Sequence, residues 1–348
     1  SDFVYRQATR AKAFDALRGL LPAASLSNVG IYGTGQAYEA LLLRMRSHPL
    51  PEARTYADLI LHELRKVIPS FLKRVDLADR GVAWSTYLAT NRTAMDEVAD
   101  RLFPADTPAD GAPVVTLTDF DPEAEVKLVT AMLYAHTHVP ETQVEARVRA
   151  MSAQDRLGVV AAYVGDRSNR RHRPGRALER IDYRFDVLAD YGAFRDLQRH
   201  RMLTVEWQQL SPRHGFTRPE SIDLAGETET VDAGMARAAA LHDPLEPRFP
   251  AQAPYAVALA YKVRFVMQMN AREAMHVLEL RSGPQGHPAY REVAQQMHRL
   301  VAEQAGHHAV AEMMRYVDHA PEPSLERLEA ERRAEAGAGT LTTPKGAL

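Results

Sequence analysis

The chain repeats one pattern, A-x3-L-x-L-R-x9-R-x2-A, at an offset of 237 residues. The first instance runs from Ala37 to Ala57 and the second from Ala274 to Ala294. Around both instances the residues predict a helix, a break that contains proline, and a second helix. Such self-similarity in a shared context indicates a duplicated unit. The same offset would place the first-copy partner of Arg199–Thr204 before residue 1. We therefore expect the back half of one copy followed by the whole of a second.

Composition and periodicity divide the chain into four parts. Residues 1–103 show the spacing of amphipathic helices. Residues 104–113 are rich in proline, aspartate and glycine and form the predicted linker. A complete second copy is expected over residues 114–323, where "VVTLTDF", "IDYRFDVLADYG" and "LTVEWQQL" predict strands between helices. Residues 324–348 are predicted to be a disordered tail.

Cysteine content and charge exclude several classes of protein. The 348-residue chain has no cysteine and a formal net charge of −2. It therefore has no disulfide, thiolate metal site or cysteine nucleophile, and no metal site of another kind is predicted. Phosphate attraction must come from local clusters, and nucleic acid is not an expected partner. Charged residues interrupt the longest apolar run, and the N-terminus is no signal peptide, so we expect a cytoplasmic protein without a membrane span.

The triplet Arg-His-Arg occurs twice, at Arg171–Arg173 and at Arg199–Arg201. The first copy lies beside proline and glycine, which favours a solvated basic loop over a phosphate site. The second copy is expected to end a short helix, where cations complement the helix dipole. Arginine also binds phosphate bidentately, so a solvated helix end and an anion site both remain open for this copy.

A late helix, "NAREAMHVLELR", carries two polar stripes. Asn270 and Arg281 lie three turns apart on one of them. Arg272, His276 and Glu279 form the other. An ion-pair ladder, a buried and bonded histidine, and a functional histidine are all compatible with this second stripe.

These motifs resemble the flavin-dependent thymidylate synthases. The family's Arg-His-Arg corresponds to Arg199–Arg201, with Thr204 in place of a serine. Its Asn-x-Arg-x3-(His/Asn)-x3-Leu-Arg element corresponds to Asn270–Arg281. The resemblance covers residues 114–316, and residues 15–70 resemble the back half of another copy. It implies an α+β fold with helices packed on a small, mostly antiparallel sheet, in one and a half tandem copies.

The resemblance also implies a reaction. FAD, reduced by NADPH, would serve the transfer of a one-carbon unit from methylenetetrahydrofolate to dUMP, which gives dTMP. Because family sites form between subunits of a tetramer, we expect a homodimer that acts as a pseudo-tetramer. The implied catalytic residues are Arg199, His200, Arg201 and Arg281. The implied cofactor-binding residues are Arg199, His200, Arg201, Thr204, Asn270 and His276. The implied substrate-binding residues are Glu206, Ser211, Arg213 and Arg281.

The segment after the second triplet departs from the family pattern. Trp207 follows Glu206, and the Ser-x-Arg motif comes about two residues late, at Ser211–Arg213. The family's Ala-Gln-Trp-Glu-Ile-Arg is replaced by "GHPAYR". These departures favour an alternative function, a non-catalytic flavin- or nucleotide-binding homologue that acts as a partner or regulatory subunit.

Overall fold

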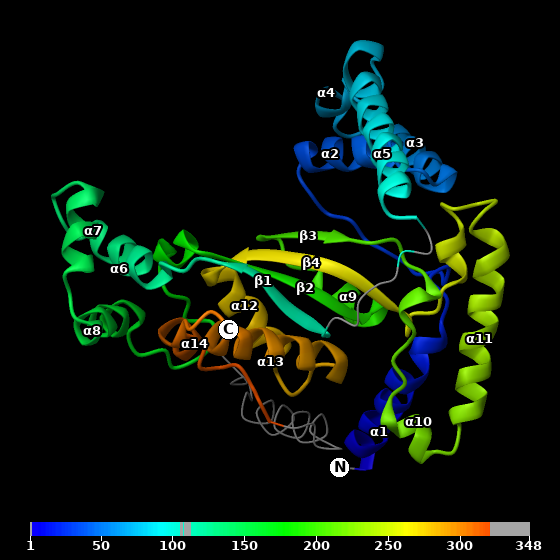
Figure 1. Ribbon diagram of the computed structural model, residues 1–348. Coiled ribbons are helices and arrows are strands. Elements are labelled where there is room, and N and C mark those ends of the chain that lie inside the picture. Colours follow the sequence, from blue (N-terminus) through cyan, green and yellow to red (C-terminus); the bar gives the residue numbers. More distant parts are fainter. Residues whose placement is uncertain (1, 105–106, 108–112, 321–348) are drawn as a thin grey trace, which may run out of the picture. The chain divides into compact units, whose positions relative to one another are not determined.

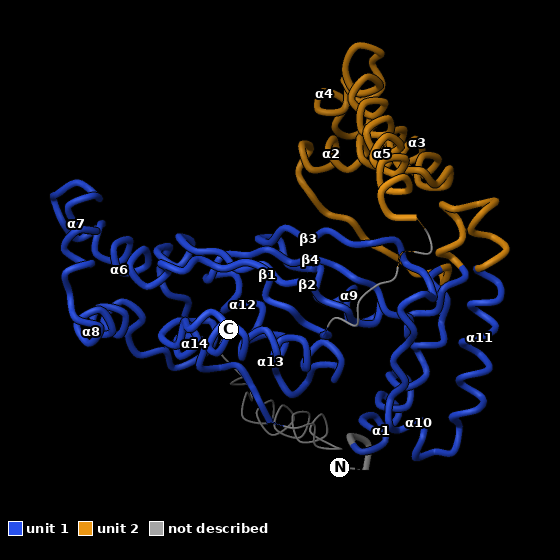
Figure 2. Tube along the Cα trace, in the orientation of Figure 1, with its two compact units in different colours: residues 1–23, 112–242, 256–348 blue, residues 24–111, 243–255 orange. Residues whose placement is uncertain are grey.

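The computed structural model describes residues 2–104, 107 and 113–320, and these form two compact units (Figure 2). The sheet unit contains the described residues of 1–23, 112–242 and 256–348. The helical unit contains those of 24–111 together with 243–255. The observed division thus differs from the predicted one, because the first helix belongs with the sheet. The predicted linker lies mostly, and the predicted tail wholly, outside the described residues.

Four strands form one antiparallel sheet in the order β1-β2-β4-β3 (Figure 1). They are β1 (Val115–Phe120), β2 (Asp182–Asp190), β3 (Leu203–Trp207) and β4 (Lys262–Asn270). The first two confirm predicted strands. The third ends before its predicted end at Leu210, because the chain turns into a short 3₁₀ helix at Pro212. This arrangement confirms the α+β class with an antiparallel sheet.

The sheet unit also contains helices, and some of them pack on one face of this sheet. The helices that begin in this unit are α1 (Asp2–Leu17), α6 (Ala124–Tyr134), α7 (Glu141–Arg149), α8 (Ala153–Val164), α9 (Tyr191–Leu197), α10 (Glu220–Leu224), α11 (Thr228–Leu245), α12 (Ala271–Arg281), α13 (Pro288–Glu303) and α14 (His308–Met313). Among the described residues, no helix is long and apolar enough to span a membrane.

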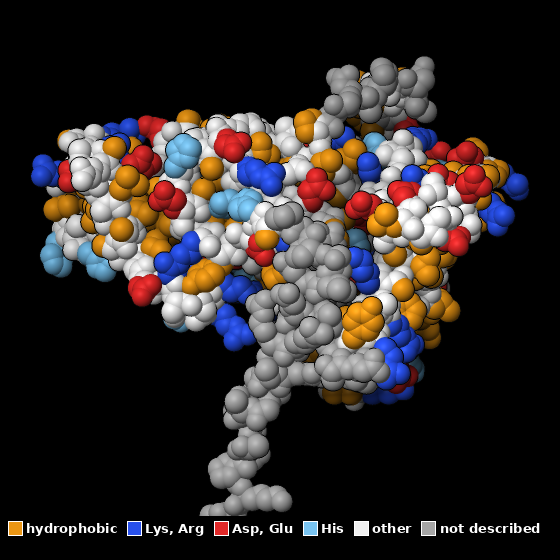
Figure 3. Space-filling view, turned by 90° about the horizontal axis from the view of Figure 1, so that it is seen from below, with side chains coloured by type: hydrophobic (Ala, Val, Ile, Leu, Met, Phe, Trp, Pro, Cys, Tyr) orange, Lys and Arg blue, Asp and Glu red, His pale blue; other side chains and the backbone are white. Residues whose placement is uncertain are grey.

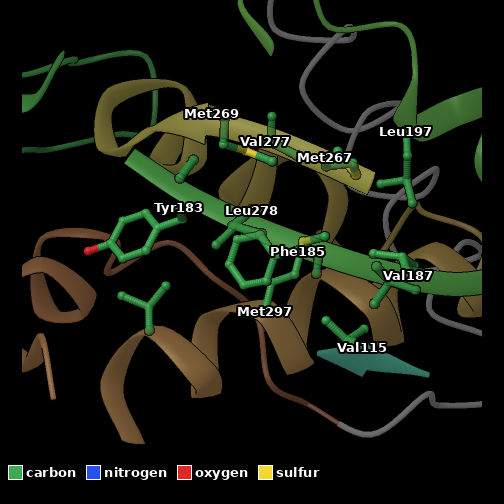
Figure 4. Packing of buried hydrophobic residues seen from close by; sticks show 14 of the residues in the cluster. Val115, Tyr183, Phe185, Val187, Leu197, Met267, Met269, Val277, Leu278 and Met297 are labelled. Atoms are coloured by element: carbon green, nitrogen blue, oxygen red, sulfur yellow. The ribbon is translucent and has the colours of Figure 1, made fainter. Parts of the chain in front are cut away.

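The core lies between the sheet and helices α12 and α13 (Figures 1 and 4). Alternate residues of β2, including Tyr183 and Phe185, point into it, opposite Met269 and Met267 of β4. Leu278 of α12 packs against them and is fully buried. Burial of one such side chain contributes about 1.5–3 kcal/mol. The period of two along β2 therefore fixes which face α12 covers.

The helical unit repeats the helix–break–helix arrangement. Its helices are α2 (Gly35–Arg46), α3 (Pro51–Leu64), α4 (Pro69–Leu72) and α5 (Ala83–Leu102). A separate core forms around Leu42, Leu61 and Leu72. Proline begins both α3 and α13, where its missing N–H costs nothing. The predicted local pattern is present in both places, and the duplication itself stays a prediction.

Candidate functional site

The second Arg-His-Arg triplet lies in a turn after α9. Asp190 caps this helix, and its carboxylate accepts a hydrogen bond of 2.8 Å from the Ala193 N–H. The helix ends at Leu197, so the prediction that the triplet ends the helix is wrong by about two residues. Phe194 and Leu197 are anchored in the core, and the turn after them directs His200 inward.

His200 is the buried member of the triplet and joins α9 to α12. Arg281 Nε donates a hydrogen bond of 3.0 Å to His200 Nε2, and His200 Nδ1 lies 3.5 Å from Glu273 Oε1. A ring nitrogen that accepts from arginine carries no proton, so the geometry assigns the proton to Nδ1, beside the carboxylate. The imidazole is thereby held in one tautomer between a cation and an anion.

Helix α12 brings its polar side chains together through its cap and its periodicity. Asn270 caps the helix, its side-chain oxygen accepting from the Glu273 N–H at 2.9 Å. The His276 ring lies edge-on to His200, with 5.4 Å between the ring centroids. Burial and the nearby Arg173 guanidinium lower the pKa of His276, although Glu273 acts in the opposite direction. His276 is thus neutral at pH 7.

At the end of α12, Arg281 contacts Tyr290 and Asp196 in addition to His200. Its guanidinium lies over the Tyr290 ring, 5.5 Å from the centroid, and its NH1 is 3.9 Å from Asp196. Tyr290 belongs to the segment "GHPAYR", so the residue that departs from the family pattern forms a platform beneath this arginine. Asp196 also pairs with Arg199 at 3.0 Å, and most of the Arg199 side chain remains exposed.

The side chains of the first triplet are exposed, as the sequence predicts, but the triplet also contacts α12. Arg173 NH2 is hydrogen-bonded to His276 Nδ1 at 3.1 Å, and the Pro174 carbonyl accepts from Arg272 Nε at 3.1 Å. Each contact spans about a hundred residues of sequence, so a local reading of charges and turns could not detect it. Both triplets therefore contact the polar side chains of α12.

Five predicted residues do not join this cluster; one of them is Arg201, whose side chain is exposed. In β3, Thr204 and Glu206 alternate with Leu203, Val205 and Trp207 and pair with Gln268 and Val266. Their side chains therefore lie on the face of the sheet that is opposite to the core and α12. Ser211 is buried and its hydroxyl accepts from the Arg213 N–H, whereas the Arg213 side chain is exposed. Their predicted roles remain predictions.

The cluster also offers a set of metal-ligand atoms. Ligand atoms of His200, Glu273 and His276 lie within 4.8 Å of one another, and two histidines with a glutamate are a known zinc set. However, each imidazole already contacts a guanidinium, from Arg281 or Arg173. The two guanidinium groups would repel a bound metal cation, so the electrostatics favour an anionic ligand.

The positive character of the site is local. On the face shown in Figure 3, basic and acidic side chains are interspersed. This distribution accords with the formal net charge of −2. An anion is therefore attracted by the arginines around α12 and not by a general positive potential.

Sequence reasoning missed Arg173, Asp196, Glu273 and Tyr290. Glu273 lies three residues after Asn270, and its backbone N–H donates to the Asn270 side chain. This spacing is typical of a helix N-cap and could have indicated Glu273 from the sequence. Asp196 lies within the segment that carries the triplet. The triplet Arg171–Arg173 drew attention to Arg173 but not to its contact with His276, and nothing in the local pattern indicates Tyr290.

The fold and this cluster define an α+β protein with a polar, arginine-rich site on one helix. The family model described as "Thymidylate synthase complementing protein", Thy1, matches residues 115–307. The chain belongs to the Thy1 family. The match covers the four strands and the helices that carry the site.

Three curated relatives are UPF0159 proteins. Those of Chlamydia pneumoniae and Chlamydia muridarum are 36% and 34% identical, over 95% and 97% of this chain. That of Thermoplasma acidophilum is 30% identical over 97% of the chain. The chain spans 62%, 63% and 66% of the lengths of these relatives.

A solved structure also matches part of the chain. It is a crystal structure of flavin-dependent thymidylate synthase ThyX from Helicobacter pylori, complexed with FAD and dUMP. The match has a TM-score of 0.39 and 18% identity, and it covers 54% of this chain and 93% of that one.

Proposed function

We propose that this chain carries the flavin site of an FAD-dependent thymidylate synthase that converts dUMP to dTMP. Methylenetetrahydrofolate would supply the one-carbon unit and NADPH the reducing equivalents. The observation that carries the proposal is the network of Arg281, His200 and Glu273, which joins the two motifs that resemble the family. Membership of the Thy1 family supports it.

The donor set fits an anionic, planar cofactor. Arg281 and Arg173 both have guanidinium groups at the site, and guanidinium binds phosphate through paired N–H groups and stacks on flat rings. The two imidazoles supply further flat surfaces. When bound, FAD would supply the hydride chemistry.

The protein residues would act by orientation and charge. Glu273 and Arg281 hold His200 in one tautomer, which fixes where the ring donates and accepts. Tyr290 and Asp196 fix the Arg281 guanidinium, so little side-chain entropy would be lost when it binds an anion. Arg281 would bind a phosphate of the flavin or of the nucleotide, or polarise a pyrimidine carbonyl.

The test has two stages. The protein is purified with and without added FAD, and retained flavin is measured from its absorbance spectrum. We expect a yellow protein, and a colourless protein that takes up no FAD would refute the proposal. Tritium release from dUMP labelled at carbon 5 is then measured with NADPH and methylenetetrahydrofolate present.

A second candidate function is a flavin- or nucleotide-binding homologue without catalytic activity. It is favoured by the β3 segment, where Thr204 and Glu206 point away from the face that α12 covers. Flavin retention without tritium release would support this function. Release at a rate that depends on Arg281 would exclude it.

A further inference from the structure

The segment from Asp166 to Arg176, which we name the basic loop, carries five arginines but is not a free loop. Arg167 is buried and both of its terminal nitrogens bond to Glu279 of α12, each at 2.7 Å. The same guanidinium donates to the carbonyls of His172 and Met313. One end of the basic loop is therefore fixed to α12 by a buried ion pair.

A second anchor lies after Arg173. Pro174 is buried, and its carbonyl accepts the bond from Arg272 of α12. Gly175 packs against the Tyr163 ring so closely that a side chain there would collide with it. Arg173 is thus held between two fixed points.

Arg173 differs from the other anchored arginines in its partners. Arg167 pairs with Glu279, and Arg176 pairs with Glu179 at 2.8 Å. Among the described residues, Arg173 has no carboxylate partner, and its hydrogen bond goes to the neutral His276 ring. Its remaining N–H groups are on an exposed side chain beside the cluster. An arginine in a fixed position without a balancing carboxylate is suited to bind an anion.

We propose that Arg173 is an anion-binding residue of the α12 site and takes a phosphate or pyrophosphate group of its ligand. The identification of that ligand as FAD or dUMP rests on the proposed function. Arg173 would therefore distinguish a phosphorylated ligand from its unphosphorylated counterpart. The anchors at Arg167 and Pro174 set the position of this residue.

The experiment measures equilibrium binding of five probes by calorimetry. The probes are inorganic pyrophosphate, FAD, riboflavin, dUMP and deoxyuridine. They are titrated into the wild-type protein, Arg173→Gln and Arg171→Gln. Arg171 is an exposed arginine of the same loop and is the matched control. The FAD–riboflavin and dUMP–deoxyuridine pairs identify which phosphate is bound.

We expect Arg173→Gln to weaken pyrophosphate binding, and that of FAD or dUMP, by about tenfold or more. The affinities for riboflavin and deoxyuridine should change by less than about twofold. Arg171→Gln should bind all five probes as the wild type does. Unchanged binding of all phosphate probes in Arg173→Gln would overturn the proposal. An equal loss of FAD and riboflavin would also overturn it, since the residue would then act on the ring or on the fold.

The two proposals can fail separately. If the wild type binds pyrophosphate through Arg173 but binds neither flavin nor dUMP, the proposed function fails and the anion site stands. If it binds flavin and Arg173→Gln is silent, the anion site fails alone. A wild type that binds none of the probes contradicts both.

Discussion

Two helix pairs, α2–α3 and α12–α13, have similar local construction and very different polar content. In each pair an arginine of the second helix donates to carbonyls between the helices: Arg54 to His48 and Pro49, and Arg291 to Ser282. On the first helix, the positions of Leu42 and Glu39 correspond to those of Glu279 and His276 at the repeat offset. The helix–break–helix arrangement of α2 and α3 thus forms without a glutamate at the Glu279 position or a histidine at the His276 position. In α12 these two side chains serve contacts with the basic loop, Glu279 with Arg167 and His276 with Arg173.

The buried ion pair should give the largest effect on stability. Glu279→Leu copies the residue that α2 has at this position, but it leaves the Arg167 guanidinium buried without its carboxylate. We expect a loss of about 3–5 kcal/mol in the free energy of unfolding. The double variant Arg167→Met with Glu279→Leu should recover most of it. An unchanged stability in the single variant would contradict this account.

Each unit has its own reporter for this measurement. The chain has two tryptophans, of which Trp207 lies in the sheet unit and Trp84 in the helical unit. In a Trp84→Phe background, urea unfolding followed by fluorescence reports on the sheet unit alone. In a Trp207→Phe background the Glu279→Leu change should be silent.

The second effect concerns binding. Arg281→Ala removes the donor to His200 and should weaken FAD binding about tenfold to a hundredfold. Arg44→Ala changes the corresponding residue of α2, which is exposed, and should leave the affinity unchanged. Fluorescence titration with FAD checks both variants. A similar loss in the two would remove the distinction between the helix pairs.

The third effect is a dependence of stability on pH. Burial and nearby arginines lower the pKa of His276, and the same causes lower that of His48 in the helical unit. The folded state then binds fewer protons than the unfolded chain. The stability that each neutral histidine permits is therefore fully present above about pH 6.5, the pKa of the unfolded chain. This part of the free energy of unfolding is lost as the pH falls below that value.

Substitution of each histidine should flatten this dependence in its own unit. His276→Gln should reduce the slope reported by Trp207, and His48→Gln that reported by Trp84. Part of the slope in the sheet unit should remain, because burial also lowers the pKa of His214 and His307. Slopes that do not respond to either substitution would refute the assignment.

The smallest effect concerns the helix caps. Asn270 caps α12 through a bond of 2.9 Å, and Thr34 caps α2 through one of 3.3 Å. Asn270→Ala should cost about 1 kcal/mol and Thr34→Ala somewhat less. Thermal unfolding with the two tryptophan reporters measures both. If Asn270→Asp keeps the wild-type stability and Asn270→Ala does not, capping is the cause.

Local sequence patterns predicted those strands and breaks that depend on residues close together in the chain. Alternation of Tyr183 and Phe185 predicted β2, and proline predicted the breaks within two helix pairs, where the structure has Pro51 and Pro288 begin the second helices. The same alternation places Thr204 opposite the core, so this position was predictable once Val205 was assigned inward.

Long-range contacts were beyond the sequence pattern. Arg173 meets His276 and Arg167 meets Glu279 only because the basic loop folds back onto α12. The charges after Asn169 predicted solvation, and Arg170, Arg171 and Arg173 are indeed exposed. Burial of Arg167 depends on a partner that lies 112 residues away.

The number of FAD molecules bound per chain tests the central claim most directly. Equilibrium dialysis of the wild-type protein against FAD gives this number, with Arg281→Ala and Arg44→Ala as matched variants. We predict one FAD per chain, with occupancy clearly reduced in Arg281→Ala at the same FAD concentration and unchanged in Arg44→Ala. No bound FAD, or two per chain with both variants affected, would contradict the assignment of the site to α12.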